Sequence, residues 1–211
     1  VALEQHIFDA DQLVEALSDA EVVVAMRERT PFPAAILDRL PDLKLLITTG
    51  MANASIDVAA ARRNGVVVCG TASKGAPTAE LTWGLILSLL RSIPAEHTGM
   101  RDGGWQRTIG GDLEGATLGL LGFGRLGRKM VPVAQAFGME VLVWSQNLDP
   151  EAARALGAEP VEKPELFRRA DIVSVHYKLS ERSRGLVGAD EIGAMKPSAY
   201  LVNTSRGPLV D

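Results

Sequence analysis

The sequence predicts an α/β protein with parallel sheets, and two observations lead to that prediction. Short runs rich in Val, Leu and Ile alternate with segments of helical pattern along most of the 211 residues. These runs are almost continuously apolar, as parallel strands covered by helices on both faces require. The alternation stops near residues 73–76 and resumes after a long apolar segment, so we predict two domains, residues 1–74 and residues 75–211.

The first alternation predicts a small α/β domain. The expected elements are helices at residues 11–17, 34–40 and 56–63, and strands at residues 21–25, 44–48 and 66–68. Asn64 and Gly65 follow the third helix and are typical of a helix C-terminus. Three strand and helix pairs within about 70 residues are the pattern of a compact α/β unit.

The second domain begins with a long helix, expected at residues 77–91, and continues with a second alternation. This helix is apolar over most of its circumference, which predicts that it is buried between layers. A polar, glycine-rich stretch follows it. Four strands are then expected, with helices between them, at residues 118–121, 140–144, 171–175 and 199–203.

Composition excludes several classes of function. The net charge is −4, from 22 Lys and Arg against 26 Asp and Glu, so no strongly basic face for nucleic acid is expected. No apolar run approaches the ~18 residues of a membrane span. Cys69 is the single cysteine, which rules out an internal disulfide and fits the reducing cytoplasm. No group of His, Cys, Asp and Glu has the spacing of a metal site, so no metal is expected.

The two ends of the sequence suggest an internal piece of a longer chain. The first residue is Val1 rather than Met, and it leads almost directly into a predicted helix. The last residue, Asp211, is of a type that commonly precedes a helix, yet no helix follows. We therefore expect further residues of the whole protein on both sides.

A glycine motif gives the second domain its first functional prediction. Residues 122–127 read Gly122-Phe123-Gly124-Arg125-Leu126-Gly127 and match G-x-G-x-x-G between a predicted strand and a predicted helix. Gly122 would allow the tight turn, Gly124 the approach of a diphosphate, and Gly127 close packing of helix on strand. This context predicts a dinucleotide-binding, doubly wound sheet of the Rossmann type, and the alternative is a tight turn without a ligand.

The end of the next strand does not decide between the two nicotinamide cofactors. An acid that binds the ribose 2′-hydroxyl is expected there, but Ser145 occupies the position and Gln146 and Asn147 follow it. No Arg for a 2′-phosphate is present either. NAD and NADP therefore both remain open, with a slight preference for NAD. Asp149 comes too late in the chain and is expected to cap the helix that starts at Pro150.

Two polar residues lie where ligands bind in such sheets, beyond the carboxyl ends of strands. Arg206 follows the last strand, and its planar cation could hold a carboxylate and stabilise an alkoxide beside a nicotinamide. The alternative is a structural arginine that bonds loop carbonyls. His176 follows the strand before it. We expect His176 to pack beside the cofactor or to satisfy a backbone group rather than to act as an acid or base.

Taken together, these motifs resemble the D-isomer-specific 2-hydroxyacid dehydrogenases over nearly the whole chain. Residues 49–57 are similar to the substrate-domain loop of that family, and Ala79-Glu80 to its connecting helix. Residues 122–127 are similar to its cofactor loop and residues 176–187 to its next strand end. The most specific likeness is that of Met195-Lys196-Pro197 and of residues 201–211.

The resemblance implies a Rossmann-type domain beside a smaller flavodoxin-like substrate domain, with a cleft between them. It implies hydride transfer between a nicotinamide dinucleotide and C2 of a small 2-oxo or 2-hydroxy acid of D configuration. Backbone amides of Met51, Ala52 and Asn53 would bind the substrate carboxylate together with Arg206. The implied cofactor contacts are Thr78, Gly122, Phe123, Gly124, Arg125, Leu126, Gly127, Ser145, His176, Tyr177, Lys178, Thr204, Ser205 and Arg206.

The family also uses a Glu–His pair as its general acid/base, and neither residue occurs here at a matching position. The resemblance therefore implies an active whole protein and an inactive fragment. It further implies a homodimer formed through the long helix, which contains Trp83, and the extended segment after it, which contains Trp105. For each Trp, core packing is the alternative.

Two other functions stay open at this level. A binding protein of the same fold could sense a dinucleotide without catalysis. Another Rossmann ligand, such as S-adenosylmethionine, would also tolerate Ser145, although Arg206 and its flanking residues argue against it.

Overall fold

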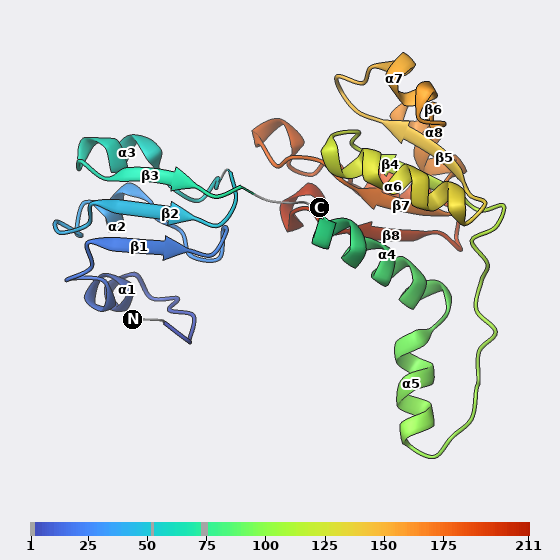
Figure 1. Ribbon diagram of the computed structural model, residues 1–211, viewed down its shortest axis with the longest axis horizontal. Coiled ribbons are helices and arrows are strands. Elements are labelled where there is room, and N and C mark those ends of the chain that lie inside the picture. Colours follow the sequence, from blue (N-terminus) through green and yellow to red (C-terminus); the bar gives the residue numbers. More distant parts are fainter. Residues whose placement is uncertain (1–2, 52, 73–75) are drawn as a thin grey trace. The chain divides into compact units, whose positions relative to one another are not determined.

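The computed structural model describes residues 3–51, 53–72 and 76–211. The chain divides into two compact units, Val1–Lys74 (unit 1) and Gly75–Asp211 (unit 2). Each has its own sheet, drawn in blue to teal for unit 1 and in green to red for unit 2 (Figure 1). The predicted boundary at residues 73–76 falls mostly on residues 73–75, which lie outside the described part of the chain.

Unit 1 is a three-stranded parallel sheet in the order β1-β2-β3. Its strands are β1 (Val22–Ala25), β2 (Leu45–Thr48) and β3 (Val67–Gly70), and its helices are α1 (Ala10–Ala16), α2 (Ala34–Leu37) and α3 (Val58–Arg63). Asp9 and Asp57 cap α1 and α3 through their carboxylates. Side chains from the three helices join Val23 and Leu46 in one core. All three helices therefore share a single face of the sheet.

The opposite face of the unit 1 sheet carries apolar side chains that are open to solvent. Val22, Val24 and Val67 are 53%, 64% and 59% exposed. Along β1, exposed and buried positions alternate. The expectation of a sheet covered on both faces is thus wrong for the described part of unit 1, because helices cover one face and the valines on the other meet none of them.

Unit 2 is a five-stranded parallel sheet in the order β6-β5-β4-β7-β8. The strands are β4 (Thr117–Leu121), β5 (Glu140–Trp144), β6 (Glu159–Pro160), β7 (Ile172–Val175) and β8 (Tyr200–Asn203). One core contains residues of α4 (Ala76–Leu90), α6 (Arg125–Ala136) and α7 (Pro150–Ala155). A second core contains residues of α8 (Lys163–Arg169) and α9 (Ala189–Ala194). Helices therefore cover both faces, and the predicted doubly wound sheet of the Rossmann type is confirmed.

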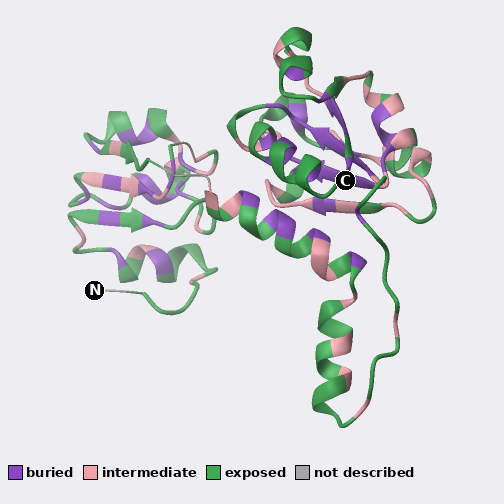
Figure 2. Cartoon of the chain, turned by 45° about the vertical axis from the view of Figure 1, so that its right-hand side comes forward, coloured by how far each residue is buried: buried purple, intermediate pink, exposed green. Residues whose placement is uncertain are grey.

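The long helix α4 differs from its prediction. Trp83 and Ile86 are buried, but Leu81, Leu85 and Leu89 are 57%, 39% and 43% exposed. The expectation that α4 is buried between layers is wrong, because one side packs on α6 and β8 while Leu81, Leu85 and Leu89 on the other side are exposed. The striping of buried and exposed residues along this helix is visible in Figure 2.

The polar stretch after α4 contains a helix that the glycine pattern did not predict. Helix α5 (Ile93–Arg101) has Pro94 in its first turn and contains no buried residue. Together with residues 102–111 it projects away from the sheet of unit 2 (Figure 1). We call residues 93–111 the arm. No helix within the described ranges is long and apolar enough to cross a membrane.

Candidate functional site

The candidate site lies where the strand order of unit 2 reverses. Strand β4 is the centre of the sheet, with β5 on one side and β7 on the other. The connections after β4 and β5 lead to α6 and α7, which belong to the first core. The connection after β7 leads to α9, which packs on the second core. Open α/β sheets bind ligands at such a switch point, outside the carboxyl ends of the strands.

The glycine loop begins with a turn that holds three strand ends together. Gly122 donates its backbone N–H to the Trp144 carbonyl at 2.8 Å, and His176 donates its own to the Leu121 carbonyl at 2.8 Å. Gly122 has φ +106°, a conformation that L side chains rarely adopt. A Cβ at this position would lie 2.5 Å from the His176 carbonyl oxygen. Only glycine fits here, because the backbone after β7 lies directly against it.

The rest of the loop opens helix α6. Gly127 lies so close to the Gly122 carbonyl that a Cβ there would overlap its oxygen, whereas a Cβ on Gly124 would meet no atom within 4 Å. Gly124 is the N-cap of α6 and supplies no side-chain cap, so the first amides of the helix have no side-chain partner from it. An open approach to helix amides suits an anionic phosphate group. The loop therefore fits the diphosphate of a dinucleotide.

The side chains within the loop point in different directions. Phe123 is buried in the core below α6, and the Arg128 guanidinium lies 5.3 Å from its ring centroid. Phe123 can therefore meet a ligand only through its backbone. Arg125 is exposed and Leu126 is half-buried. Pro132 lies inside α6, which continues through it from Arg125 to Ala136.

The end of β5 lies beside the segment after β7. The rings of Trp144 and Tyr177 stack with centroids 6.0 Å apart and an interplanar angle of 18°. The Tyr177 hydroxyl accepts the Gln146 N–H at 3.3 Å. Ser145, which lies between Trp144 and Gln146 in the sequence, is half-buried. Asp149 accepts the N–H groups of Glu151 and Ala152, so its carboxylate caps α7 as predicted.

His176 is held in its neutral form. Its Nε2 shares a hydrogen bond of 2.9 Å with the Ser174 hydroxyl, and Ser174 is fully buried in β7. Burial lowers the pKa of His176 to about 4, because the charged imidazolium is poorly solvated there. His176 is therefore uncharged at neutral pH, which fits a packing role beside the loop.

The turn after β8 is built around a residue that the sequence did not single out. The Asn203 side chain accepts the Ser205 N–H at 3.0 Å and donates to the Arg206 carbonyl at 2.9 Å. Ser205 in turn donates its hydroxyl to the Tyr177 carbonyl at 2.6 Å. The turn that carries Arg206 is thus tied to the segment after β7. An Asn at the end of a strand is a common turn residue and was the available signal.

Helix α4 joins the same site through two threonines. The buried Thr82 hydroxyl lies 2.8 Å from the Thr204 hydroxyl and donates to the Thr78 carbonyl at 2.8 Å. This links the first turns of α4, which contain the predicted contact Thr78, to the end of β8. Arg206 is half-buried, and its guanidinium donates to the Ser205 carbonyl at 2.9 Å. Thr82 was not predicted, since nothing in the sequence pairs it with a residue 122 positions away.

The predicted substrate loop of unit 1 has its own internal order. The Asn53 amide donates to the Arg27 carbonyl and the Thr48 hydroxyl, and its oxygen accepts from Ser55. Its side chain is therefore engaged in holding the loop, which leaves the backbone for a ligand. Met51 is 74% exposed, and Ala52 lies outside the described residues. The Arg27 guanidinium lies against Gly50, a cation beside this loop that the sequence analysis missed.

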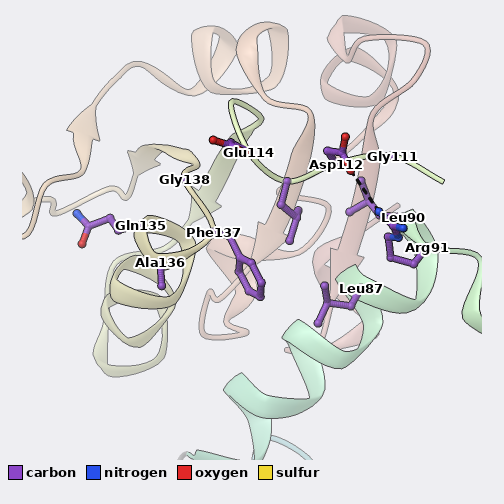
Figure 3. A pocket seen from close by; sticks show the side chains of 11 residues that line it. Leu87, Leu90, Arg91, Gly111, Asp112, Glu114, Gln135, Ala136, Phe137 and Gly138 are labelled. Atoms are coloured by element: carbon purple, nitrogen blue, oxygen red, sulfur yellow. Dashed lines mark hydrogen bonds and ion pairs between the residues drawn. The ribbon is translucent and has the colours of Figure 1, made fainter. Parts of the chain in front are cut away.

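A pocket of about 590 Å³ lies at the amino ends of strands β4 and β5, opposite to the ends that carry the glycine loop (Figure 3). It is lined by the end of α4, by residues 111–114 and by the end of α6, which precede β4 and β5 in the chain. Arg91 and Asp112, which both line the pocket, form an ion pair of 3.2 Å. The pocket is therefore distinct from the glycine loop, which follows the carboxyl end of β4.

The neutral state of His176 makes a prediction for stability against pH. The unfolded chain takes up a proton at this imidazole near pH 6.5, whereas the folded chain does so only near pH 4. The contribution of His176 to the free energy of unfolding should therefore fall by about 3 kcal/mol as the pH drops from 6.5 to 4. Urea unfolding at a series of pH values measures this loss. His176→Gln should remove it, the exposed His97→Gln should not, and equal slopes for both variants would contradict the buried neutral state.

Comparisons with known proteins identify the family of this site. The family model for the D-isomer specific 2-hydroxyacid dehydrogenase, NAD binding domain, matches residues 83–211. A D-3-phosphoglycerate dehydrogenase from Methanocaldococcus jannaschii is 35% identical over 205 residues, which cover 95% of this chain and 39% of that protein. A hydroxypyruvate reductase from Thermotoga maritima is 33% identical over 211 residues, covering 98% of this chain and 67% of that protein.

A solved structure of a similar protein supports the same family. The crystal structure of a phosphoglycerate oxidoreductase from Vibrio cholerae matches with a TM-score of 0.96 and 36% identity, over 100% of this chain and 69% of that chain. The chain spans 39% and 56% of the first two curated relatives, so it covers part of their length. The match of residues 83–211 and the relatives together show that this chain belongs to the D-isomer-specific 2-hydroxyacid dehydrogenase family.

Proposed function

We propose that the whole protein is an oxidoreductase that transfers a hydride between a nicotinamide dinucleotide and C2 of a small 2-oxo or D-2-hydroxy acid. The observation that carries this proposal is the glycine loop at the switch point, with the turn of Arg206 tied beside it through Ser205 and Tyr177. A diphosphate and a carboxylate would then have their binding groups at neighbouring strand ends.

The chain's own residues bind and orient the cofactor in this proposal. The amides that open α6, with Gly124 leaving space and Arg125 and Leu126 following, would hold the diphosphate. The adenosine half would lie beyond β5, near Ser145, and would meet His176, Tyr177 and Lys178. The nicotinamide half would meet Thr78, Thr204, Ser205 and Arg206. The cofactor, when bound, supplies or accepts the hydride.

Arg206 is the catalytic residue in this proposal. Its guanidinium would bind the substrate carboxylate and stabilise the alkoxide that develops at C2 as hydride adds to the carbonyl. In unit 1, the backbone amides of residues 51–53 are the groups that the family resemblance assigns to binding a substrate carboxylate. The Glu–His pair of the family has no matching position in residues 1–211, so we assign proton transfer to residues outside this sequence. His176 does not replace that pair, because it is neutral and hydrogen-bonded to Ser174.

We also propose that the protein is a homodimer joined through the arm and the outer side of α4. Helix α5 has no buried residue, and a nine-residue helix is marginally stable in water without a packing partner. In the arm, Ile93, Trp105 and Ile109 are 50%, 75% and 90% exposed. Such a concentration of exposed apolar side chains is typical of an interaction surface. Trp83, by contrast, packs on Phe137 in the core.

A cytoplasmic location completes the proposal. Cys69 is a free, exposed thiol, which suits a reducing compartment.

The glycine loop gives the first test. Gly124→Val should reduce nucleotide affinity at least a hundredfold, because its side chain would enter the space proposed for the diphosphate. Its thermal stability should remain close to that of the wild type, since a Cβ meets nothing within 4 Å and φ is −78°. Gly127→Ala should instead lower stability, because its Cβ overlaps the Gly122 carbonyl. Fluorescence titration and thermal unfolding measure the two effects, and unchanged affinity in folded Gly124→Val would refute the site.

The catalytic assignment is tested at Arg206. Arg206→Ala in the full-length protein should lower turnover of a 2-oxo acid at least a hundredfold, because an oxyanion-stabilising group is lost. Nucleotide affinity should fall far less than turnover, because the amides that open α6 hold the diphosphate without Arg206. Arg206→Lys should recover part of the turnover, since it restores the charge without the planar fork. Absorbance at the nicotinamide band measures the rate, and a wild type that binds nucleotide but turns over no 2-oxo acid would favour a dinucleotide-sensing protein.

The dimer is tested with the arm. The full-length wild type should sediment as a dimer at micromolar concentration. The double variant Trp105→Ser, Ile109→Ser should raise the dimer dissociation constant at least tenfold, because two exposed apolar side chains no longer reach the second copy. Leu156→Ser, an equally apolar exposed site at the end of α7, serves as the control. A monomeric wild type, or equal effects of the two changes, would contradict the proposed interface.

A further inference from the structure

We infer that the cofactor is NADP(H) rather than NAD(H), and that the Lys178 ammonium binds the 2′-phosphate of its adenosine ribose. The inference rests on the proposed nucleotide site and names the residue that selects between its two cofactors. It runs against the slight preference for NAD drawn from the sequence. Four features of unit 2 lead to it.

The first feature is the missing carboxylate at the end of β5. A carboxylate in this position binds the free 2′-hydroxyl of NAD and repels a 2′-phosphate. Ser145 stands there, and exposed Gln146 and Asn147 follow. The next acid, Asp149, is engaged with the N-terminus of α7 through two backbone N–H groups. The described residues of this strand end therefore offer neutral hydrogen-bonding groups and no repulsion against a phosphate.

The second feature is the fixed position of the segment that carries Lys178. Tyr177 stacks on Trp144 at the end of β5, and its hydroxyl accepts the Gln146 N–H at 3.3 Å. Its carbonyl accepts the Ser205 hydroxyl at 2.6 Å, and the Lys178 carbonyl accepts the Ser183 hydroxyl at 2.8 Å. The backbone at residues 177 and 178 is thus fixed, and the Tyr177 side chain reaches from it to the Ser145–Gln146 turn.

The third feature is the side of the sheet on which Lys178 lies. Val173, Val175, Tyr177 and Leu179 all pack into the core with α8 and α9. Alternate residues along an extended segment point to opposite sides. The intervening residues therefore point toward α6, and the Cβ of His176 indeed lies 3.9 Å from the Cβ position of Gly127. By the same alternation, with Tyr177 and Leu179 in the core, Lys178 is placed on the side of the glycine loop proposed for the phosphates.

The fourth feature is the charge of Lys178 itself. Lys178 is exposed, and within the part of the chain that the structure describes its ammonium forms no hydrogen bond or ion pair. The other lysine near β5, Lys163, is committed elsewhere: it pairs with Glu191 at 2.8 Å and donates to the Leu186 carbonyl at 2.9 Å. A long, unpaired lysine beside a neutral turn can form a charge-assisted hydrogen bond to a phosphate.

The test uses two ligands that differ only in the group concerned. Adenosine 2′,5′-bisphosphate and adenosine 5′-monophosphate are titrated into the full-length protein by calorimetry, with no turnover required. The wild type should bind the bisphosphate at least about tenfold more tightly, and this preference should shrink as salt is added. Lys178→Gln should bring the two affinities to within a factor of two, through a loss for the bisphosphate alone. Lys178→Arg should keep the preference.

Lys129→Gln is the matched control, since Lys129 is an exposed lysine of α6 and its removal changes the net charge equally. It should leave the preference unchanged. A wild type that binds the monophosphate as tightly as the bisphosphate, or a Lys178→Gln variant that keeps the preference, would overturn the role of Lys178 while leaving the nucleotide site in place. Binding of neither ligand would overturn both the inference and the proposed site.

Discussion

The site depends on the contact between Gly122 and the backbone that leaves β7. The Gly122 N–H reaches the Trp144 carbonyl, the His176 N–H reaches the Leu121 carbonyl, and the Cα of Gly122 lies against the His176 carbonyl. The ends of β5, β4 and β7 are therefore fixed relative to one another by backbone contacts at Gly122. Because a Cβ at Gly124 would meet no atom within 4 Å, the approach to the first amides of α6 stays open.

Much of this arrangement could be predicted from local sequence, because its causes are local. The buried strands are short runs of Val, Leu and Ile, the glycine loop has fixed spacing, and Asp149 followed by Pro150 is a common start of a helix. These features act within about six residues of one another. The positions of β4, β5, β7, β8 and of the loop followed from them, and so did the doubly wound order of unit 2. The two-residue edge strand β6 (Glu159–Pro160) was not predicted.

Other features could not be predicted because they depend on contacts between distant residues. The Thr82–Thr204 hydrogen bond joins positions 122 residues apart, and the place of the Arg27 side chain beside Gly50 follows from the pairing of β1 with β2. Helix α5 lies in a glycine-rich segment whose propensity for helix is low, and it contains no buried residue that would give an apolar pattern. The one-sided burial of α4 was missed for a related reason. An apolar residue has the same pattern in sequence whether it meets a core or a second protein.

The open face of the unit 1 sheet affects how this segment behaves in solution. Val22, Val24 and Val67 form an exposed apolar surface on parallel strands, and Cys69 adds an exposed thiol on the edge strand β3. Such a surface favours colloidal self-association that grows with concentration, and the thiol permits slow intermolecular crosslinking in air. A preparation restricted to these residues would therefore need dilute handling and a reductant to remain monodisperse.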